Sequence, residues 1–185
     1  KYYALKEQNN DGNWFNWKSD VIVDLAKIEE AKVLQFLFHY QWNILHKYCN
    51  SKGVQIIGDM PIYVSYNSSD VFFNKNLFEL NTNGEMVYQS GAPPCEFQIN
   101  GQLWETPIYN WKSHKESNFK WWKQRFSKLF EMVDQIRLDH FIGYAKYFKI
   151  PIDSTSAHNG VWVDGPGEAF FDELLLSFNE FNVVV

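Results

Sequence analysis

The residue types best suited to chemistry stand together in one short stretch of the chain, residues 135–141, with the sequence Gln-Ile-Arg-Leu-Asp-His-Phe. Its alternation predicts a strand, with Arg137 and Asp139 on one face and His140 on the other. A guanidinium beside a carboxylate keeps that carboxylate ionised, which is the state a carboxylate nucleophile needs. The same pair can also form an ordinary salt bridge at a strand end, and these seven residues alone do not choose between the two interpretations.

The elements around this stretch predict where it would lie in a fold. Helical and strand-like segments follow one another in the order helix, strand, long loop, helix, strand, loop, helix, strand. The expected helices cover about 29–53 with Gly53 as the stop, 117–133 with Ser117 as the N-cap, and 168–180, and the expected strands lie near 54–59, 135–141 and 183–185. Such alternation favours a parallel sheet with helical crossovers, hence an α/β fold. A doubly wound sheet fits the same order, but the chain lacks the Gly-x-Gly-x-x-Gly turn of nucleotide-binding sheets, so we favour a (β/α)8 TIM barrel.

Two long connections interrupt this order. The first covers about 60–116 and includes a hairpin turn at Asn83-Gly84 and an expected irregular segment at 91–94, Gly-Ala-Pro-Pro. The second follows residue 141 and is expected to remain a loop until the next helix, and residues 1–20 are expected to be loop-like too. Loops of this length inside a compact domain are usually functional, so the site is expected among them.

Composition and charge argue against several classes of protein. The net charge is −5 and the pI about 5.5, which gives no electrostatic reason to bind nucleic acid or an anionic membrane. Residues 1–20 lack the apolar core of a signal peptide, and no apolar run approaches the roughly 20 residues of a membrane span. Cys49 and Cys95 form neither a metal-ligand spacing nor a disulfide framework. We therefore expect a cytoplasmic protein that uses no metal or other cofactor.

The length and the two ends of the chain predict a piece of a longer protein. The chain has 185 residues, begins at Lys1 rather than at a methionine, and ends with Val183-Val184-Val185 in mid-strand. A complete (β/α)8 barrel needs roughly 250 residues. We therefore expect residues 1–185 to form one partial catalytic barrel domain, incomplete at both ends, with an inserted loop region at about 60–116.

Three stretches of the chain would converge at the carboxyl ends of the predicted strands, namely 58–72, 91–104 and 137–141. Together they hold carboxylates, an arginine, a histidine and aromatic rings, but no metal cluster and no phosphate cradle. This inventory suits glycoside chemistry, which uses a pair of carboxylates around an oxocarbenium-like transition state. Most of the chain's abundant aromatic residues are expected in the core, whereas rings in loop-like stretches, such as Trp104, suit stacking on sugar faces.

These stretches resemble the amylomaltase family, the 4-α-glucanotransferases or disproportionating enzymes of glycoside hydrolase family 77. The resemblance covers nearly the whole chain, through four motifs in the family's order: Gly-Asp-Met-Pro-Ile-Tyr-Val at 58–64, Trp-Trp-Lys-Gln-Arg-Phe at 121–126, Arg-Leu-Asp-His-Phe-Ile-Gly at 137–143, and Gly-Pro-Gly-Glu-Ala-Phe-Phe at 165–171. It implies a (β/α)8 barrel with inserted subdomains that moves an α-1,4-glucan segment from a donor to the 4-hydroxyl of an acceptor glucan, with retention. The implied substrates are maltooligosaccharides and starch-type glucans.

The resemblance also implies catalytic roles. Asp139 would be the nucleophile, and Arg137 would hold its carboxylate ionised and near the substrate. The acid/base group would be the glutamate of a Glu-Asp-Leu-Gly stretch just after the strand at 183–185, and a third, stabilising carboxylate would lie further on. Because neither is within the chain, residues 1–185 alone are expected to be inactive.

The substrate-binding residues implied by the resemblance come from all three stretches. Asp59 and Tyr63 would line the subsite next to the scissile bond, and Trp104 would pack on bound glucan. His140 belongs to the nucleophile's motif, although strand alternation predicts a ring turned away from Asp139.

The chain departs from the family pattern at three places in loops expected to contact substrate. Asn67 stands where an aspartate is common, Cys95-Glu96 follows two prolines where the family has aspartate, and Glu105-Thr106 replaces Gly-Asn. These departures keep two alternatives open, a glucan-binding pseudoenzyme and an α-glucan hydrolase.

Overall fold

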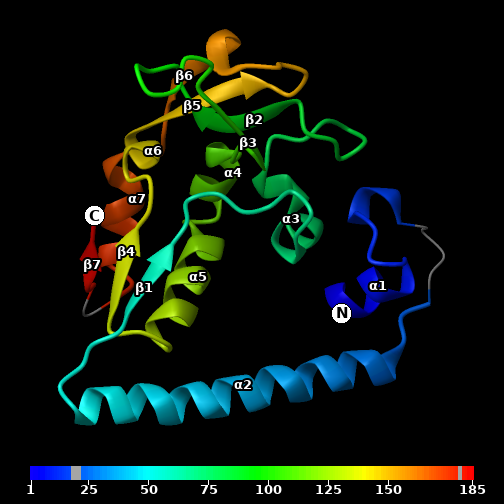
Figure 1. Cartoon of the computed structure of the whole chain (residues 1–185). Coiled ribbons are helices and arrows are strands. Elements are labelled where there is room, and N and C mark those ends of the chain that lie inside the picture. The colour runs from blue at the N-terminus through cyan, green and yellow to red at the C-terminus, as the bar shows by residue number, and fades with distance from the viewer. Residues whose placement is uncertain (18–21, 179–180) are drawn as a thin grey trace.

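The computed structural model describes residues 1–17, 22–178 and 181–185, and its strands form two sheets (Figure 1). The first is parallel, with the order β1-β4-β7, and consists of β1 Ile57–Met60, β4 Gln135–Leu138 and β7 Val183–Val184. The second is antiparallel, with the order β3-β2-β5-β6, and consists of β2 Tyr88–Ala92, β3 Gln102–Pro107, β5 Lys146–Pro151 and β6 Val161–Asp164. The predicted parallel sheet with crossovers is confirmed, and the whole is a mixed α/β fold.

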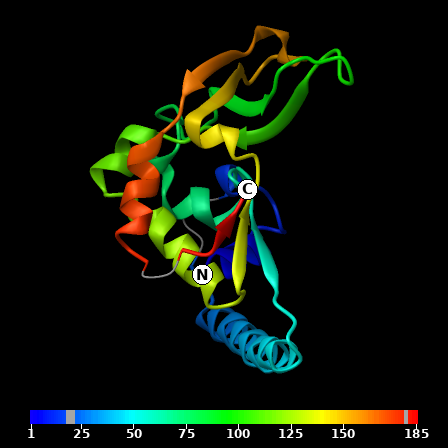
Figure 2. The same cartoon turned by 90° about the vertical axis from the view of Figure 1, so that its left-hand side faces the viewer.

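The described helices cover the ends and one side of these sheets (Figures 1 and 2). The α-helices are α1 Tyr2–Gln8, α2 Leu25–Ser51, α3 Ser69–Phe73, α4 Trp111–Glu116, α5 Lys120–Phe130, α6 Ile142–Ala145 and α7 Glu168–Leu175, and short 3-10 turns lie at Trp14–Asn16, Lys75–Leu77 and Ala157–Asn159. Within the described ranges, none of the helices combines the length and the apolarity needed to cross a membrane.

The main core lies where α5 and α7 pack on the parallel sheet. Trp122 and Phe126 are four residues apart on α5, so they share one helix face, and both are completely buried. They belong to the same core cluster as Ile136 of β4 and Phe170 of α7. An ion pair from Lys123 Nζ to Glu173 Oε2 (2.7 Å) also joins the two helices. This packing fixes β4, which carries the central motif.

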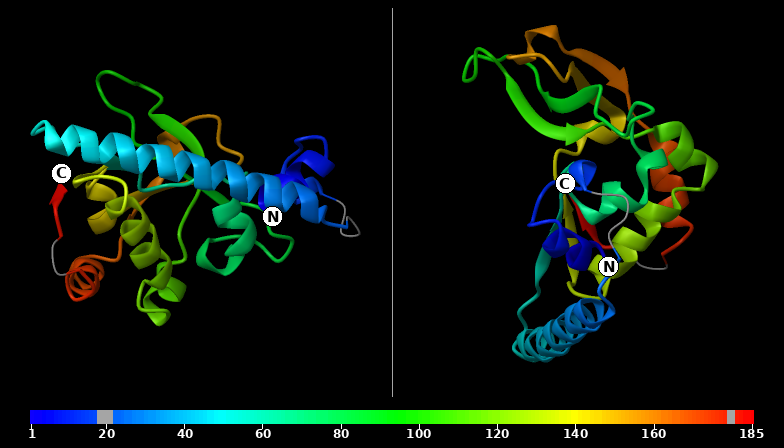
Figure 3. Two further views of the ribbon diagram at one scale, coloured as in Figure 1. Left: turned by 90° about the horizontal axis from the view of Figure 1, so that it is seen from below. Right: turned by 90° about the vertical axis from the view of Figure 1, so that its right-hand side faces the viewer.

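The long helix α2 crosses the molecule beneath the parallel sheet (Figure 3). The Trp42 indole donates a hydrogen bond to the carbonyl oxygen of Met132 (2.7 Å). Asp134 accepts hydrogen bonds from the Asn50 amide (3.0 Å) and from the backbone N–H of Ile56 (2.7 Å). Asp134 therefore ties the end of α2 to the beginnings of both β1 and β4.

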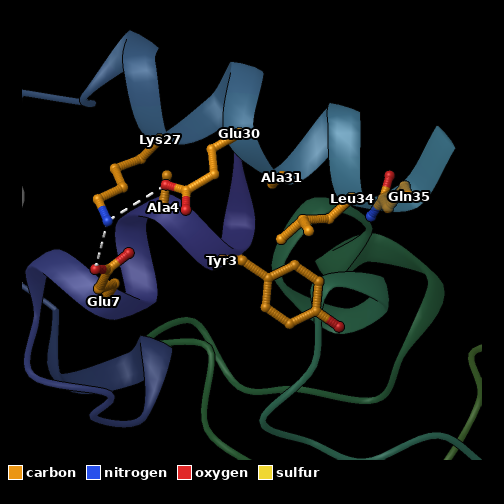
Figure 4. Close-up of a pocket in the computed structure, with 8 residues that line it drawn as sticks. All are labelled: Tyr3, Ala4, Glu7, Lys27, Glu30, Ala31, Leu34 and Gln35. Atoms are coloured by element: carbon orange, nitrogen blue, oxygen red, sulfur yellow. Dashed lines mark ion pairs between the residues drawn. The ribbon is translucent and has the colours of Figure 1, made fainter. Parts of the chain in front are cut away.

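Helix α1 packs against the first half of α2, with a shallow pocket between them (Figure 4). Lys27 of α2 lies between Glu7 of α1 (3.0 Å) and Glu30 (3.4 Å), and the Tyr3 ring faces Leu34. The expectation that residues 1–20 are loop-like is therefore wrong for α1, whose apolar contacts come from α2 and the core, while residues 18–21 lie outside the described residues.

Several predicted boundaries are wrong, in part because the helices begin or end at capping residues other than the expected ones. Helix α2 begins at Leu25, where Asp24 caps it, rather than near 29, and β1 begins at Ile57 rather than 54. Ser117 ends α4 instead of starting the next helix, and its hydroxyl donates to the carbonyl oxygen of His114 (2.9 Å). Helix α7 ends at Leu175, and residues 179–180 of the predicted helix lie outside the described part of the chain. The turn at Asn83-Gly84 forms, but with only a single bridge, Leu80 to Met86, rather than flanking strands.

The sequence did not predict the antiparallel sheet, whose strands lie in segments that were expected to be loops. The segment 91–94 is not irregular throughout, because Gly91 and Ala92 lie in β2. A Cβ on Gly91 would stand 2.1 Å from the Gln102 carbonyl oxygen of β3, so glycine is required here for close strand approach rather than for a turn. The expected loop after residue 141 contains β5 and β6, with Phe148 and Ile150 buried in a small core of their own.

A buried histidine makes the stability of this fold sensitive to pH. His114 of α4 is completely buried, its Nε2 lies 3.1 Å from the Leu77 carbonyl oxygen, and its Nδ1 has no partner among the described residues. Burial lowers the pKa of His114 to about 4, although the contact with Leu77 works in the opposite direction. Protonation is therefore favoured in the unfolded chain, and the folded state loses stability as the pH falls from about 6.5 toward 4.

We predict that the free energy of unfolding of the complete protein falls by up to about 3 kcal/mol over this pH range because of His114. His114→Gln removes the titration, so its loss between pH 7 and pH 4.5, measured by urea denaturation, should be smaller. The control is His158→Gln, which changes an exposed histidine. An equal loss in His114→Gln and wild type would contradict the prediction.

Candidate active site

One arginine joins two carboxylates at the carboxyl ends of neighbouring parallel strands. Asp59 of β1 pairs in register with Arg137 of β4, and Asp139 follows β4 directly. Arg137 Nη2 lies 2.7 Å from Asp59 Oδ2 and 3.1 Å from Asp139 Oδ1. Hydrogen bonding and attraction from Asp59, with a smaller contribution from Asp139, raise the pKa of Arg137. All three side chains are about half exposed, so a substrate can reach them.

A pocket of about 370 Å³ opens beside this cluster, between the carboxyl ends of β1 and β4 and strand β3. It is lined by Pro61, Ile62, Tyr63, Trp104, Thr106, Asp139 and His140. Four of the six site residues expected from the sequence thus line one pocket, and the other two, Asp59 and Arg137, are joined to Asp139 by the ion pairs. The expected site residues come together although Asp59 and His140, the two farthest apart in the chain, are 81 positions apart.

Aromatic rings form the wall of the pocket. The Trp104 ring lies 4.9 Å from the His140 ring, edge to face, and 5.9 Å from the Tyr63 ring. Tyr63 stacks in turn on the buried Tyr109 (5.8 Å, 13° between planes), and burial raises the pKa of the Tyr63 phenol. The Trp104 indole donates to the side chain of Gln102 (2.7 Å). These contacts hold flat apolar surfaces in place, as a sugar-binding pocket requires.

His140 shows where strand alternation fails. The strand ends at Leu138 rather than at residue 141, and His140 has φ +49°, so the chain turns there into α6. The expectation of a ring turned away from Asp139 is therefore wrong, because both residues line the same pocket. Burial lowers the pKa of His140 against the opposing charge of Asp139, and its buried Nε2 has no partner in the described part of the chain. A Cβ on Gly143 would stand 2.6 Å from Ile62 Cδ1 and 3.0 Å from His140 Cδ2, so a larger residue here would require one or both of these pocket residues to shift.

Two residues that were not among the expected site residues support the pocket. Arg125 of α5 lies over the rings of Trp121 and Trp122 (5.2 and 5.1 Å) and donates from Nη2 to the Pro61 carbonyl oxygen (2.8 Å). The motif at 121–126 therefore holds the loop that carries Tyr63. Thr106 lines the pocket itself, and its hydroxyl is bonded to that of Ser90. The sequence could have indicated Thr106 as a pocket residue, because it lies two residues after Trp104 and therefore on the same face of a strand.

The three departures from the family pattern have different surroundings. Asn67 accepts from Tyr2 Oη and from the backbone N–H of Trp14 (3.1 Å each) and donates to the side chain of Asn13 (2.6 Å), so its amide ties down the N-terminal segment. Cys95 is an exposed free thiol in a turn. Glu105 has φ +54°, a conformation that favours the glycine expected there. Of the residues at these three places, only Thr106 lines the pocket beside Asp139.

The pocket combines a carboxylate, Asp139, that is paired with Arg137, and aromatic side chains that line its wall. Across the described ranges 1–17, 22–178 and 181–185, no group of three or more His, Cys, Asp or Glu side chains is placed to hold a metal ion. The groups present can supply a carboxylate nucleophile, charge stabilisation from Arg137 and stacking surfaces for sugar rings.

Comparison with known proteins agrees with this chemistry. A family model described as 4-alpha-glucanotransferase matches residues 1–185, the whole chain. The chain belongs to the 4-α-glucanotransferase family. Relatives in this family include the chloroplastic/amyloplastic 4-alpha-glucanotransferase of Solanum tuberosum, 35% identical over 99% of this chain, and the 4-alpha-glucanotransferase of Streptococcus pneumoniae serotype 4, 36% identical over all of it.

Solved structures of 4-α-glucanotransferases share the fold. An amylomaltase from Streptococcus agalactiae in complex with acarbose is 35% identical and superposes with a TM-score of 0.87 over 98% of this chain. An amylomaltase from Corynebacterium glutamicum, 18% identical, shows the same fold with a TM-score of 0.76. The chain spans only 34% of the potato relative and 39% of each streptococcal protein.

The position of Trp104 predicts a role in binding rather than in folding. Its ring belongs to the wall of the pocket and to neither buried core cluster. Trp104→Ala in the complete protein should weaken binding of long α-glucans by about tenfold or more, with little change in melting temperature. The matched control is Trp162→Ala on β6, a half-exposed ring outside the pocket. A large fall in melting temperature for Trp104→Ala would show instead that the ring is part of the core.

Proposed function

We propose that this chain is the nucleophile-bearing part of a 4-α-glucanotransferase that acts on maltooligosaccharides and starch-type α-1,4-glucans. The observation that carries the proposal is Asp139, which lines a pocket walled by Tyr63, Trp104 and His140 and is paired with Arg137. The family membership, the acarbose complex of the streptococcal amylomaltase and the names of the relatives support the same activity.

The reaction we propose is a retaining double displacement. A carboxylate oxygen of Asp139 attacks the anomeric carbon, the glycosidic C–O bond breaks, and the departing 4-oxygen takes a proton from an acid. The 4-hydroxyl of an acceptor glucan then gives its proton to the same group and attacks the glycosyl-enzyme, which releases Asp139. Arg137 orients Asp139 and stabilises its charge. Tyr63 and Trp104 stack on the sugars, and Asp59 and His140 offer hydrogen bonds beside the scissile bond.

The acid/base group required by this reaction is assigned to a residue outside the chain. Asp59 is the carboxylate joined to Asp139 through Arg137 Nη2, but a proton donor is poorly served by a guanidinium, which favours the ionised form. We therefore propose that Asp59 binds substrate, and that the acid/base is the glutamate which the family resemblance puts after the strand at 183–185.

We propose further that residues 1–185 form one partial (β/α)8 barrel domain, with an insertion at about 60–116. The β1-β4-β7 sheet is parallel and has the crossover connections that a barrel segment needs. Helix α2 exposes large apolar side chains, among them Val33, Phe36, Tyr40 and Ile44. Such a surface supports the proposal, because further barrel elements would cover it.

Since Cys49 and Cys95 are both free, we propose a reducing compartment, the cytoplasm.

Of the alternatives, the intact Arg137–Asp139 pair favours an enzyme over a glucan-binding pseudoenzyme. Transferase and hydrolase differ in their products from maltotriose. A transferase makes longer oligomers together with glucose, whereas a hydrolase makes mainly short sugars.

Substitution of the proposed nucleophile gives the direct test. Asp139→Asn in the complete protein should abolish transfer from maltotriose and leave glucan binding largely intact, because an amide does not form the glycosyl-enzyme. Asp153→Asn, at an exposed carboxylate outside the pocket, is the matched control. Retention of more than a small fraction of the wild-type kcat by Asp139→Asn would show that Asp139 is not the nucleophile.

A second test uses the chain as given. Residues 1–185 expressed alone should give no detectable disproportionation of maltotriose, because general acid–base catalysis, typically worth about 10²–10⁴-fold, is missing opposite Asp139. Exposed edges of β1 and β7 and the apolar face of α2 should also promote self-association. Robust glucose release by the purified monomer would mean that an acid/base lies within the chain.

A further inference from the structure

A second pocket lies on the other side of β3 from the active-site pocket. Neighbouring residues of β3 face the two pockets in turn, with Trp104 lining the first and Glu105 the second. The segment after β1 is divided in the same way, because Tyr63 lines the first pocket and residues 65–67 line the second. The second pocket has a volume of about 380 Å³, close to that of the first.

The backbone at Glu105 is held in a conformation that glycine adopts more easily. Strand β3 bulges from β2 between the pairs Gly91–Leu103 and Gln89–Pro107, and Glu105 stands in this bulge at φ +54°. Its backbone N–H donates to Gln89 Oε1 (3.1 Å), which fixes the bulge. The Glu105 carboxylate makes no hydrogen bond or ion pair with any described residue. A strained backbone that presents a carboxylate without a protein partner points to a function for that carboxylate.

The other polar groups around the second pocket suit a polyhydroxylated ligand. The hydroxyls of Ser65 and Ser154 line it, and within the described part of the chain neither has a hydrogen-bond partner. The Asn13 amide completes the polar lining and is held in place by Asn67 (2.6 Å). Hydroxyl, amide and carboxylate groups around one pocket of this size offer both donors and acceptors to sugar hydroxyls.

An aromatic platform completes the second pocket. The Phe15 ring is 41% exposed and stacks on Tyr66, with 4.9 Å between centroids and 16° between planes. Tyr66 is fixed by a hydrogen bond from its hydroxyl to the Gly84 carbonyl oxygen (2.7 Å), and Trp14 packs edge-on against it. The outer face of Phe15 is therefore a rigid apolar surface of the kind on which a pyranose ring stacks.

We propose that this second pocket binds an α-glucan, with Phe15 stacked on a sugar ring and the Glu105 carboxylate accepting hydrogen bonds from its hydroxyls. The choice of an α-glucan as ligand rests on the proposed function. The two pockets share β3 as a common wall, so long chains gain contacts in the second pocket.

The test is affinity electrophoresis in amylose-containing gels, with the complete protein carrying Asp139→Asn so that the glucan is not consumed. Glu105→Gln and Phe15→Ala, added separately, should each raise the apparent Kd for amylose by about fivefold. The matched controls Glu116→Gln and Phe73→Ala alter an exposed glutamate on α4 and an exposed ring on α3, both outside the second pocket, and should leave it unchanged.

The two variants keep the result interpretable, because they come from different parts of the chain. If Glu105→Gln raised the apparent Kd for amylose and Phe15→Ala did not, Glu105 would act through its neighbour Trp104 on the active-site pocket. That result would overturn the proposal. Unchanged amylose affinity in Glu105→Gln would also overturn it, as would a lower melting temperature without weaker binding in Phe15→Ala. Wild-type transfer from maltotriose, assayed in parallel, tests the proposed function separately, since this second pocket is tested by binding alone.

Discussion

The ion pairs of Arg137 depend on the register of two parallel strands. Asp59 and Arg137 meet because β1 and β4 align residue for residue, and Asp139 joins them because its backbone N–H reaches the Met60 carbonyl oxygen (3.2 Å) just beyond the paired strands. A slip of one residue would turn Arg137 into the core and separate the charges. The packing of α5 and α7 on β4, and the bonds of Asp134 at its start, therefore act on the active site even though they lie away from it.

The pocket beside this cluster is formed where the two sheets meet. The parallel sheet supplies Asp139 and His140 from its carboxyl end, and the antiparallel sheet supplies Trp104 and Thr106 from β3. The loop carrying Tyr63 crosses between them and is held by Arg125, whose guanidinium stacks on two tryptophans. The tryptophan-rich motif of α5 thus positions the Tyr63 side of the pocket, although none of the motif's residues lines the pocket.

Two of the departures from the family pattern, Asn67 and Glu105, have different roles in the structure. Asn67 has a structural role, because its amide donates to Asn13 and accepts from Tyr2 and Trp14, which a carboxylate could do only in part. Glu105 carries a charged side chain at a left-handed position and directs it away from the active-site pocket. Asp139 and Glu105 therefore line pockets on opposite sides of β3.

The sequence by itself determined the elements whose signals are local. Apolar spacing predicted α2, α5 and α7, a short apolar run predicted β1, and alternation predicted β4. The motifs around Asp59 and Asp139 indicated which strand ends would meet. The antiparallel sheet was decided by tertiary structure. From the sequence, Gly91 indicates a turn, whereas in the structure it is a strand residue that allows the backbone of Gln102 to approach closely. The same holds for His140, whose positive φ ends the alternation that predicted its direction, and for the pairing of Asp59 with Arg137. Gly91 depends on a partner 11 residues away, Asp59 on one 78 residues away, and His140 on the turn that follows, and local sequence patterns do not contain that information.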